Sequence, residues 1–227
     1  MSWFRSTSAK PEAPKKDARS AGGAEPQVHR SLALGSLFDE FRRGRKLQVL
    51  DLGPATGSNV EFLSQFGCKI YIEDLFAALT ARAVSLEDDA PGGRTEEGTE
   101  GEEAGAQFFA DFLPSPEAVS FDVVLAWDTF NYLTRRELGA FLQQLAPLCH
   151  SGTVVFAMIS ILKQMSAAPI RFRIVDEQSL AYELRTQDER PAPRYHPADL
   201  NELLRGFRVD RSFLLRHGVQ EYLFVKE

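Results

Sequence analysis

The sequence predicts an α/β domain of three layers, in which helices cover both faces of a doubly wound, mostly parallel sheet. Short apolar runs of strand length alternate with segments whose apolar residues have helical spacing, as in consecutive strand-helix-strand units. One apolar run ends in an acid-and-glycine turn at 51–57 that opens a helix. The last two apolar runs are joined by too few residues for a crossover, so we expect them to pair antiparallel.

The first half of the domain begins with a predicted helix over 28–41, because its apolar residues are spaced for one face. They are Leu32, Leu34, Leu37, Phe38 and Phe41. Gly44 follows this segment and is expected to end it. The next predicted elements are a strand over 47–52, a helix over 58–66, a strand over 68–72, a helix over 75–86 and a short strand over 106–110.

The second half has the most apolar strand patterns and ends in a hairpin. Gly206 ends the last predicted helix, and the tight turn His217, Gly218 and Val219 joins the last two strands. The predicted elements are a strand over 121–127, a helix over 134–148, a strand over 153–159, a helix over 197–204 and strands over 207–215 and 220–226.

Two segments do not have the composition of a folded core. Residues 1–27 are rich in Ser, Ala, Pro, Lys and Gly and are expected to be a disordered tail, leaving one domain over 28–227. A solvated tail explains this composition better than a transit segment does. The acidic, glycine-rich stretch 87–105 is expected to be a flexible loop.

Composition fits one enzyme-sized domain. A chain of 227 residues with 44% hydrophobic content can bury one large core. The formal charge of -6 argues against a nucleic-acid partner. Cys68 and Cys149 are too few for a disulfide framework, which favours a reducing, cytoplasmic location. No apolar run is long enough to span a bilayer, no metal site is expected, and the sequence does not indicate an oligomeric state.

The turn LQVLDLGPATGSNVEFL has the features of a nucleotide-like binding site. Gly53 and Gly57 bracket Pro54, Ala55 and Thr56, and glycine lets the backbone turn sharply and approach a ligand. Ser58 or Asn59 is expected to cap the next helix, whose free N–H groups attract an anionic group. The paired glycines that accommodate a diphosphate are missing, which argues against a dinucleotide. An ordinary strand-to-helix turn is the alternative.

The order Asp51, Leu52, Gly53, three residues, Gly57 resembles the first motif of class I S-adenosylmethionine-dependent methyltransferases. The terminal hairpin is similar to the end of the same fold, and the resemblance covers about 28–227. It implies a seven-stranded sheet whose last strand is antiparallel, with S-adenosyl-L-methionine as the cofactor. Ala55 departs from the usual middle glycine of the motif, which bears on whether the domain is active.

The resemblance also implies which residues hold the cofactor, since ligands of such sheets bind beyond the carboxyl ends of the strands. An acid after the second strand would bind the ribose hydroxyls, and Glu73 is slightly favoured over Asp74. Both acids could instead complement the start of the next helix. The implied cofactor-binding residues are Asp51, Gly53, Pro54, Ala55, Gly57, Asn59, Glu73, Asp74, Asp111, Phe112, Ala126 and Trp127.

Several of these assignments have structural alternatives. Asp111 would accept the adenine amino hydrogen and Phe112 would line the base, but Asp111 could be a surface turn residue. Ala126 and Trp127 would surround the methionine part of the cofactor, but Trp127 could be an ordinary core aromatic. These alternatives remain open at the level of sequence.

Methyl transfer depends mainly on alignment and on exclusion of water, and it needs a general base only when the acceptor arrives protonated. The implied catalytic residues are Asp128, which could instead cap a turn, and His196, which could instead mark the start of the last helix. His150 and His217 are weaker candidates, because both fall in loops or turns.

The favoured function is methyl transfer to an unidentified small molecule. The segment after the fourth strand, AWDTFNYL, lacks the Asn/Asp-Pro-Pro-aromatic pattern of enzymes that methylate planar amide or base nitrogens. The resemblance also implies that residues 162–195 are an insertion that covers the substrate. Arginines within it could grip a carboxylate or phosphate or form salt bridges on an exposed face. Two alternatives are an inactive methyltransferase-like binding domain and a nicotinamide-dependent oxidoreductase.

Overall fold

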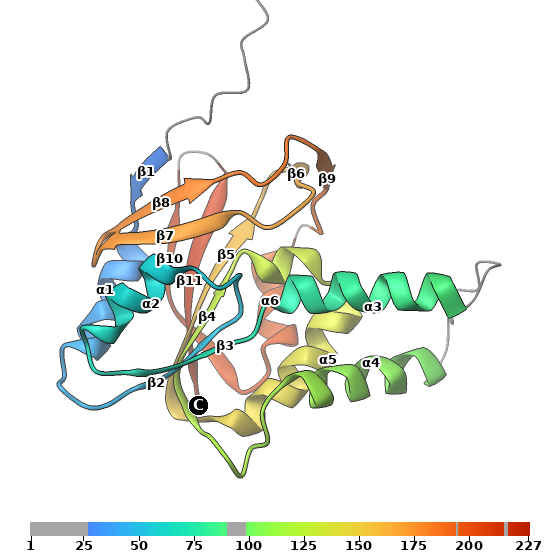
Figure 1. Ribbon diagram of the computed structural model, residues 1–227, viewed down its shortest axis with the longest axis horizontal. Coiled ribbons are helices and arrows are strands. Elements are labelled where there is room, and N and C mark those ends of the chain that lie inside the picture. The colour runs from blue at the N-terminus through green and yellow to red at the C-terminus, as the bar shows by residue number, and fades with distance from the viewer. Residues whose placement is uncertain (1–26, 90–98, 194, 216–217) are drawn as a thin grey trace, which may run out of the picture.

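A mixed six-stranded sheet forms the centre of the computed structural model, which describes residues 27–89, 99–193, 195–215 and 218–227 (Figure 1). Its order is β10-β11-β5-β4-β2-β3. The strands β3, β2, β4 and β5 are parallel, and β11 is antiparallel to both its neighbours. The predicted fold class and the antiparallel last strand are therefore confirmed. The strands are β2 (Gln48–Asp51), β3 (Lys69–Ile72), β4 (Phe121–Trp127), β5 (Cys149–Ser160), β10 (Phe207–Leu214) and β11 (Val219–Lys226).

Helices cover both faces of this sheet. The side chains of successive residues of β4 point to opposite faces of the sheet. Val123 packs in a buried cluster that contains Phe38, and Val124 packs in a second buried cluster that contains Phe109. Both clusters are fully buried apolar cores, as a doubly wound sheet requires. The helices are α1 (Leu32–Phe41), α2 (Gly57–Ser64), α3 (Leu75–Asp89), α4 (Thr99–Phe112), α5 (Arg135–Leu145) and α6 (Pro197–Leu203), with 3-10 turns η1 (Thr129–Tyr132) and η2 (Ala146–Leu148).

The predicted strand over 106–110 is wrong, because these residues lie in α4. The buried positions Gly105, Phe109 and Leu113 recur every four residues, which is a helical period and not the alternation of a strand. The described part of the central sheet therefore has six strands where seven were expected. The predicted loop over 87–105 is helical at both ends, since α3 and α4 extend into it, and 90–98 lie outside the described residues.

The predicted helix over 28–41 begins later than expected. Residues Gln27–Arg30 form β1, and α1 starts after Ser31, whose Oγ accepts a hydrogen bond from the Leu34 backbone N–H at 3.0 Å. The predicted apolar face of α1 is buried at Leu34, Leu37, Phe38 and Phe41, but Leu32 is exposed at the first turn of the helix. The predicted tail lies outside the described residues except for Gln27, which belongs to β1.

The insertion over 162–195, which we call the cover segment, consists of four short strands. They are β6 (Gln164–Ser166), β7 (Arg171–Asp176), β8 (Ser179–Glu183) and β9 (Glu189–Pro191). Strand β8 pairs with both β1 and β7, and β6 pairs with β9. Figure 1 shows these strands lying across the end of the central sheet at which β5 finishes. The cover segment therefore lies over the carboxyl ends of the parallel strands.

A buried acid joins the last strand to the first helix. Glu221 on β11 is fully buried, and its Oε2 accepts a hydrogen bond from the Ala33 N–H at 3.2 Å, at the start of α1. Its other oxygen, Oε1, has no partner among the described residues. Burial raises the pKa of Glu221, while hydrogen bonds from the α1 start lower it. The negative charge faces the positive end of the helix dipole.

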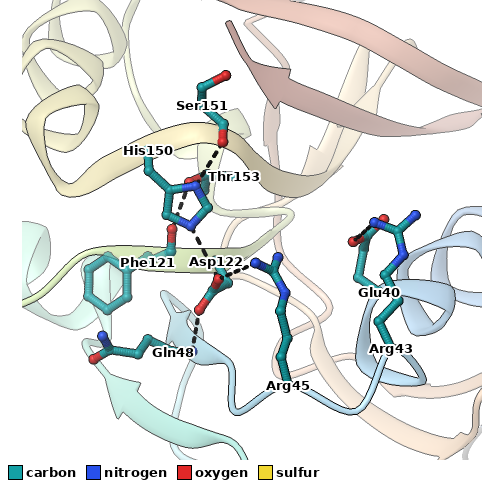
Figure 2. A network of polar contacts seen from close by, with 9 residues as sticks. All are labelled: Glu40, Arg43, Arg45, Gln48, Phe121, Asp122, His150, Ser151 and Thr153. Atoms are coloured by element: carbon teal, nitrogen blue, oxygen red, sulfur yellow. Dashed lines mark hydrogen bonds and ion pairs between the residues drawn. The ribbon is translucent and has the colours of Figure 1, made fainter.

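The opposite, amino-terminal edge of the sheet has its own polar network (Figure 2). Asp122 accepts a hydrogen bond from the Gln48 backbone N–H at 2.8 Å, and its other oxygen lies 3.2 Å from His150 Nε2 and 3.4 Å from an Arg45 nitrogen. Gln48, Asp122 and His150 lie at the starts of β2, β4 and β5. His150 is therefore at the edge of the sheet opposite to the carboxyl ends of these strands. This placement gives His150 a structural role.

Cys68 and Cys149 are free thiols, and burial raises the pKa of Cys149 to about 12. Within the described residues, no helix combines the length and apolar character needed to cross a membrane.

Candidate functional site

The carboxyl ends of β2 and β4 lie side by side at the point where the chain order of the sheet reverses. Asp51 ends β2, and its register partner on β4 is Leu125, two residues before Trp127 ends that strand. Open α/β sheets bind ligands at such a reversal, because a crevice forms between the diverging connections. The structure brings together here six residues that the sequence assigned to the site: Asp51, Gly53, Pro54, Asn59, Trp127 and Asp128.

Asp51 is the acceptor at the centre of the site. It is 4% exposed, and its Oδ1 accepts hydrogen bonds from the Gly53 backbone N–H at 3.0 Å and from Trp127 Nε1 at 2.7 Å. The pKa of Asp51 is raised to about 6, mainly by burial and to a smaller extent by the negative charge of Asp74. Both hydrogen bonds act in the opposite direction and lower it. The carboxylate therefore fixes both the glycine turn and the indole.

Gly53 makes the close approach expected of a glycine in this turn, but the group that it meets is the indole of Trp127. A Cβ at position 53 would lie 2.8 Å from Trp127 Cδ1. Trp127 has a φ of 48°, the only positive φ of a non-glycine residue in the described chain. Its ring stacks on Phe172 of β7, with centroids 5.6 Å apart and planes 10° apart. The sequence did not single out Phe172, because its partner is distant in the chain.

A small cavity remains beside this indole. Its volume of about 10 Å³ is enough for about one water molecule. The residues around it are Gly53, Pro54, Thr56, Asn59, Trp127, Asp128, Thr129, Ile170 and Phe172. The cover segment contributes the last two of these and closes the crevice in this conformation.

Asp128 has one satisfied and one unsatisfied carboxylate oxygen. Oδ2 accepts a hydrogen bond from the Ile170 backbone N–H at 2.9 Å, while the buried Oδ1 has no partner among the described residues. The residue is 8% exposed, and burial raises its pKa to about 7. A buried acceptor without a donor is costly, so this oxygen fits a hydrogen-bond donor or a cation brought by a ligand.

Asn59 does not cap α2, and neither does Ser58. The cap position is Thr56, whose Oγ1 donates to the Pro54 carbonyl at 3.1 Å. The Asn59 amide instead reaches β7, where Nδ2 donates to the Phe172 carbonyl at 3.0 Å and Oδ1 accepts from the Ile174 N–H at 2.8 Å. Its polar groups therefore attach the cover segment to the glycine turn. Ala55 and Gly57 are exposed.

The two acids after β3 have different surroundings. Asp74 Oδ1 accepts from the Ala77 backbone N–H at 2.9 Å, which is a helix-start role. Glu73 donates its backbone N–H to the Asp51 carbonyl at 2.8 Å, and partial burial raises the pKa of its side chain. No described residue makes a hydrogen bond or ion pair with the Glu73 carboxylate, which leaves Glu73 the acid that is available to a ligand at this strand end.

The remaining assigned residues lie in other settings. Asp111 is exposed on α4 and accepts from Gln107 Nε2 at 2.8 Å, so the strand end on which its adenine role depended does not exist. Phe112 packs against the buried cluster of Phe109, and Ala126 is buried in that cluster. His196 is exposed and donates its backbone N–H to Asp199 Oδ2 at 3.0 Å, as a residue at a helix start does. His217 lies outside the described residues.

The family model described as a methyltransferase domain matches residues 26–208, which include the glycine turn, the strand ends and the cover segment. The chain belongs to the methyltransferase domain family. The fold of this methyltransferase domain is that of the class I S-adenosylmethionine-dependent enzymes, and S-adenosylmethionine is their cofactor. No curated protein matches the chain.

Solved structures that resemble this methyltransferase domain share little of its sequence. A protein of Pyrococcus horikoshii is 12% identical, with 86% of this chain and 88% of that chain covered and a TM-score of 0.49. An S-adenosylmethionine-dependent methyltransferase of Clostridium acetobutylicum is 12% identical, with 85% and 90% covered and a TM-score of 0.48. Magnesium protoporphyrin IX methyltransferase of Synechocystis is 17% identical, with 86% and 78% covered and a TM-score of 0.44. The family assignment rests on the family model.

Proposed function

We propose that this methyltransferase domain is an active enzyme that transfers a methyl group to a small molecule. The observation that supports the proposal best is the buried, unpartnered Oδ1 of Asp128, a residue that lines the cavity beside Gly53. A cationic or N–H-bearing ligand at the reversal point of the sheet would satisfy this oxygen. The ammonium group of S-adenosylmethionine is such a donor.

The residues at the strand ends fit the other parts of this cofactor. Glu73 has a carboxylate with free acceptor sites, which can take hydrogen bonds from two ribose hydroxyls. Gly53 has no Cβ to obstruct a ligand. The cavity of about 10 Å³ is far too small for the cofactor, so binding requires the Trp127 indole to leave Gly53. We infer that the open form exchanges the hydrogen bond between Trp127 and Asp51 for contacts with the ligand.

The bound cofactor supplies a methyl group that is already activated on a sulfonium sulfur. The tasks left to the chain are to orient the acceptor and to exclude water. The cover segment excludes water, because Asn59 and Asp128 attach its backbone to the glycine turn and to the end of β4. Asp128 holds the charged end of the cofactor, and no residue is assigned as a general base.

Titration calorimetry with S-adenosylhomocysteine tests the cofactor site. Glu73→Gln should weaken binding by about tenfold, the equivalent of about 1.4 kcal/mol for charge-assisted hydrogen bonds. Asp74→Asn is the matched control, since Asp74 already serves the start of α3. Equal affinities of wild type and Glu73→Gln would remove Glu73 from the site. Binding of NAD in place of S-adenosylhomocysteine would overturn the proposal.

A non-catalytic binding domain is the second candidate, and the placement of Trp127 against Gly53 favours it. Release of S-adenosylhomocysteine from S-adenosylmethionine, measured against a panel of small acceptors, separates the two. If neither wild type nor Trp127→Ala binds the cofactor, the domain does not use it. If both bind but no acceptor is methylated in a panel that includes amines, alcohols, thiols and carboxylates, the binding function stands.

A further inference from the structure

An apolar groove lies beside the proposed cofactor site, between α3 and the cover segment. It has a volume of about 540 Å³, within the usual range for small-molecule sites. Its lining residues are Phe76, Ala77, Thr80, Ala81, Val84 and Arg185. The α3 members recur at helical spacing on one side of the helix, whose buried side carries Leu75. Val84 is 53% exposed, so this stripe is open to solvent.

The inner end of the groove reaches the proposed site through Tyr132. The ring of Phe76 packs edge-on against Tyr132, with centroids 5.0 Å apart. The Tyr132 hydroxyl donates to the Ser166 carbonyl on β6 at 3.1 Å. Burial raises the pKa of Tyr132, and the negative charge of Asp128 raises it further, as expected for two nearby groups. A molecule in the groove would therefore lie close to the carboxyl end of β4.

Two arginines lie at this groove although the whole chain is acidic. Arg185 lines it, and the Arg190 guanidinium lies over the Tyr132 ring at 5.7 Å. Within the described residues, neither arginine has a carboxylate at ion-pair distance. Glu183 lies 3.7 Å from Arg171, and Asp188 accepts a hydrogen bond from the Thr186 hydroxyl at 3.2 Å, so neither carboxylate pairs with these two arginines. Glu189 precedes Arg190 on a strand, so its side chain points to the other face.

We propose that this groove binds the methyl acceptor, and that the acceptor is an apolar small molecule carrying an anionic group such as a carboxylate. The apolar stripe of α3 contacts its body, and Arg185 and Arg190 bind its charge. The statement that this ligand is the methyl acceptor rests on the proposed function. The groove itself is a feature of the fold, and its ligand preference can be measured without catalysis.

The test uses two fluorescent probes of similar shape, the anionic anilinonaphthalene sulfonate and the neutral N-phenylnaphthylamine. Arg185→Gln and Arg190→Gln should each weaken binding of the anionic probe by about five- to tenfold and leave the neutral probe unchanged. Ala81→Trp, which fills the groove, should weaken both. Arg173→Gln, an exposed cover-segment arginine outside the groove that makes no ion pair with a described residue, is the matched control and should change neither.

Unchanged affinity of the anionic probe in Arg185→Gln and Ala81→Trp would overturn the proposal. Equal losses for both probes in Arg185→Gln would overturn its anionic part. Titration of S-adenosylhomocysteine into the same variants separates the two proposals, since none of the substituted residues belongs to the cofactor site. Loss of the expected probe behaviour with intact cofactor binding rejects the groove alone. Expected probe behaviour without cofactor binding rejects the proposed function and leaves an anion-selective apolar site.

Discussion

The ring N–H of Trp127 donates to Oδ1 of Asp51 at 2.7 Å, in a site from which almost all water is excluded. The same oxygen also accepts from Gly53, so one buried carboxylate holds the glycine turn and an aromatic ring that occupies the space beside it. Trp127 reaches this position with a strained positive φ, a conformation that costs about 1–3 kcal/mol for such a residue. Single substitutions in this contact therefore test the closed arrangement of the site.

Gly53→Ala should destabilise the domain by about 1–3 kcal/mol, because its new Cβ would lie 2.8 Å from Trp127 Cδ1, on a ring held by a hydrogen bond and a stack. Gly57→Ala is the matched control in the same turn. A Cβ at Gly57 has no neighbour within 4 Å, and alanine favours the helix that begins there. Urea unfolding compares the two, and similar free energies of unfolding for both variants would contradict the close contact.

Trp127→Ala should affect stability and ligand affinity in opposite directions. Loss of a buried, stacked indole should lower the free energy of unfolding by about 3–5 kcal/mol. Removal of the ring from Gly53 should tighten binding of S-adenosylhomocysteine by about tenfold, since the ligand no longer has to break a charge-assisted hydrogen bond. Calorimetry and urea unfolding measure the two effects.

A spectroscopic test follows the same ring without removing it. The sequence has two tryptophans, so Trp3→Phe leaves Trp127 as the only indole. Binding of S-adenosylhomocysteine to this variant should shift the emission to longer wavelength as the indole leaves the buried stack with Phe172. Saturable binding with an unchanged spectrum would show that the ring stays in place.

Stability should fall as the pH rises from about 4 to 7, because burial raises the pKa of Asp51 to about 6 and of Asp128 to about 7. The unfolded chain loses these protons near pH 3.9, while the folded chain retains them to higher pH. The stability that each group contributes is complete below pH 4 and is lost as the pH passes its folded pKa.

Asp128→Asn retains an acceptor oxygen for Ile170 but cannot ionise. We expect the free energy of unfolding of this variant to depend less on pH in this range. At pH 8 it should exceed that of the wild type by roughly 2–4 kcal/mol. Urea unfolding at pH 4 to 8 measures the profile. Asp39→Asn, at an exposed helix position, should keep the wild-type slope. A wild-type profile without a slope in this range would refute the raised pKa values.

Asn59→Ala should loosen the cover segment, because it removes both side-chain hydrogen bonds to the β7 backbone and leaves two buried groups unpaired. We expect the free energy of unfolding to fall by about 2–4 kcal/mol. Amide hydrogen exchange at Ile174 should become faster, because its N–H loses its acceptor. Val60→Ala, an exposed position on the same helix, is the control and should retain slow exchange. Equal protection of Ile174 in both variants would show that Asn59 does not hold β7.

The spacing of apolar residues in the sequence predicted those helices and strands whose buried positions repeat regularly along the chain. Strand β4 occupies 121–127 as predicted, because its nearly continuous apolar run is buried on both faces. The short run around Phe109 has no such signature, and its residues satisfy a helix as well as a strand. Only contact with α5, where Phe109 meets the Phe141 ring at a centroid distance of 5.4 Å, selects the helix.

The candidate site was predictable where it depends on the ends of adjacent strands, as with Asp51, Gly53 and Asp128. The partners from the cover segment were not predictable. Trp127 stacks on Phe172, and Asn59 binds the backbone of the same strand, over separations at which local sequence carries no information on orientation. The choice between Glu73 and Asp74 likewise depended on a single hydrogen bond to Ala77.

The hydrogen bond from Ala33 to Glu221 gives the domain an order of assembly. The first helix is translated early, but the acceptor for its leading backbone N–H lies on the last strand, 188 residues later. Until that strand inserts between β5 and β10, the start of the helix depends on Ser31 alone for side-chain capping. The hydrogen bond that completes the start of α1 can therefore form only after β11 is in place. Loss of Glu221 should expose α1 to proteolysis first.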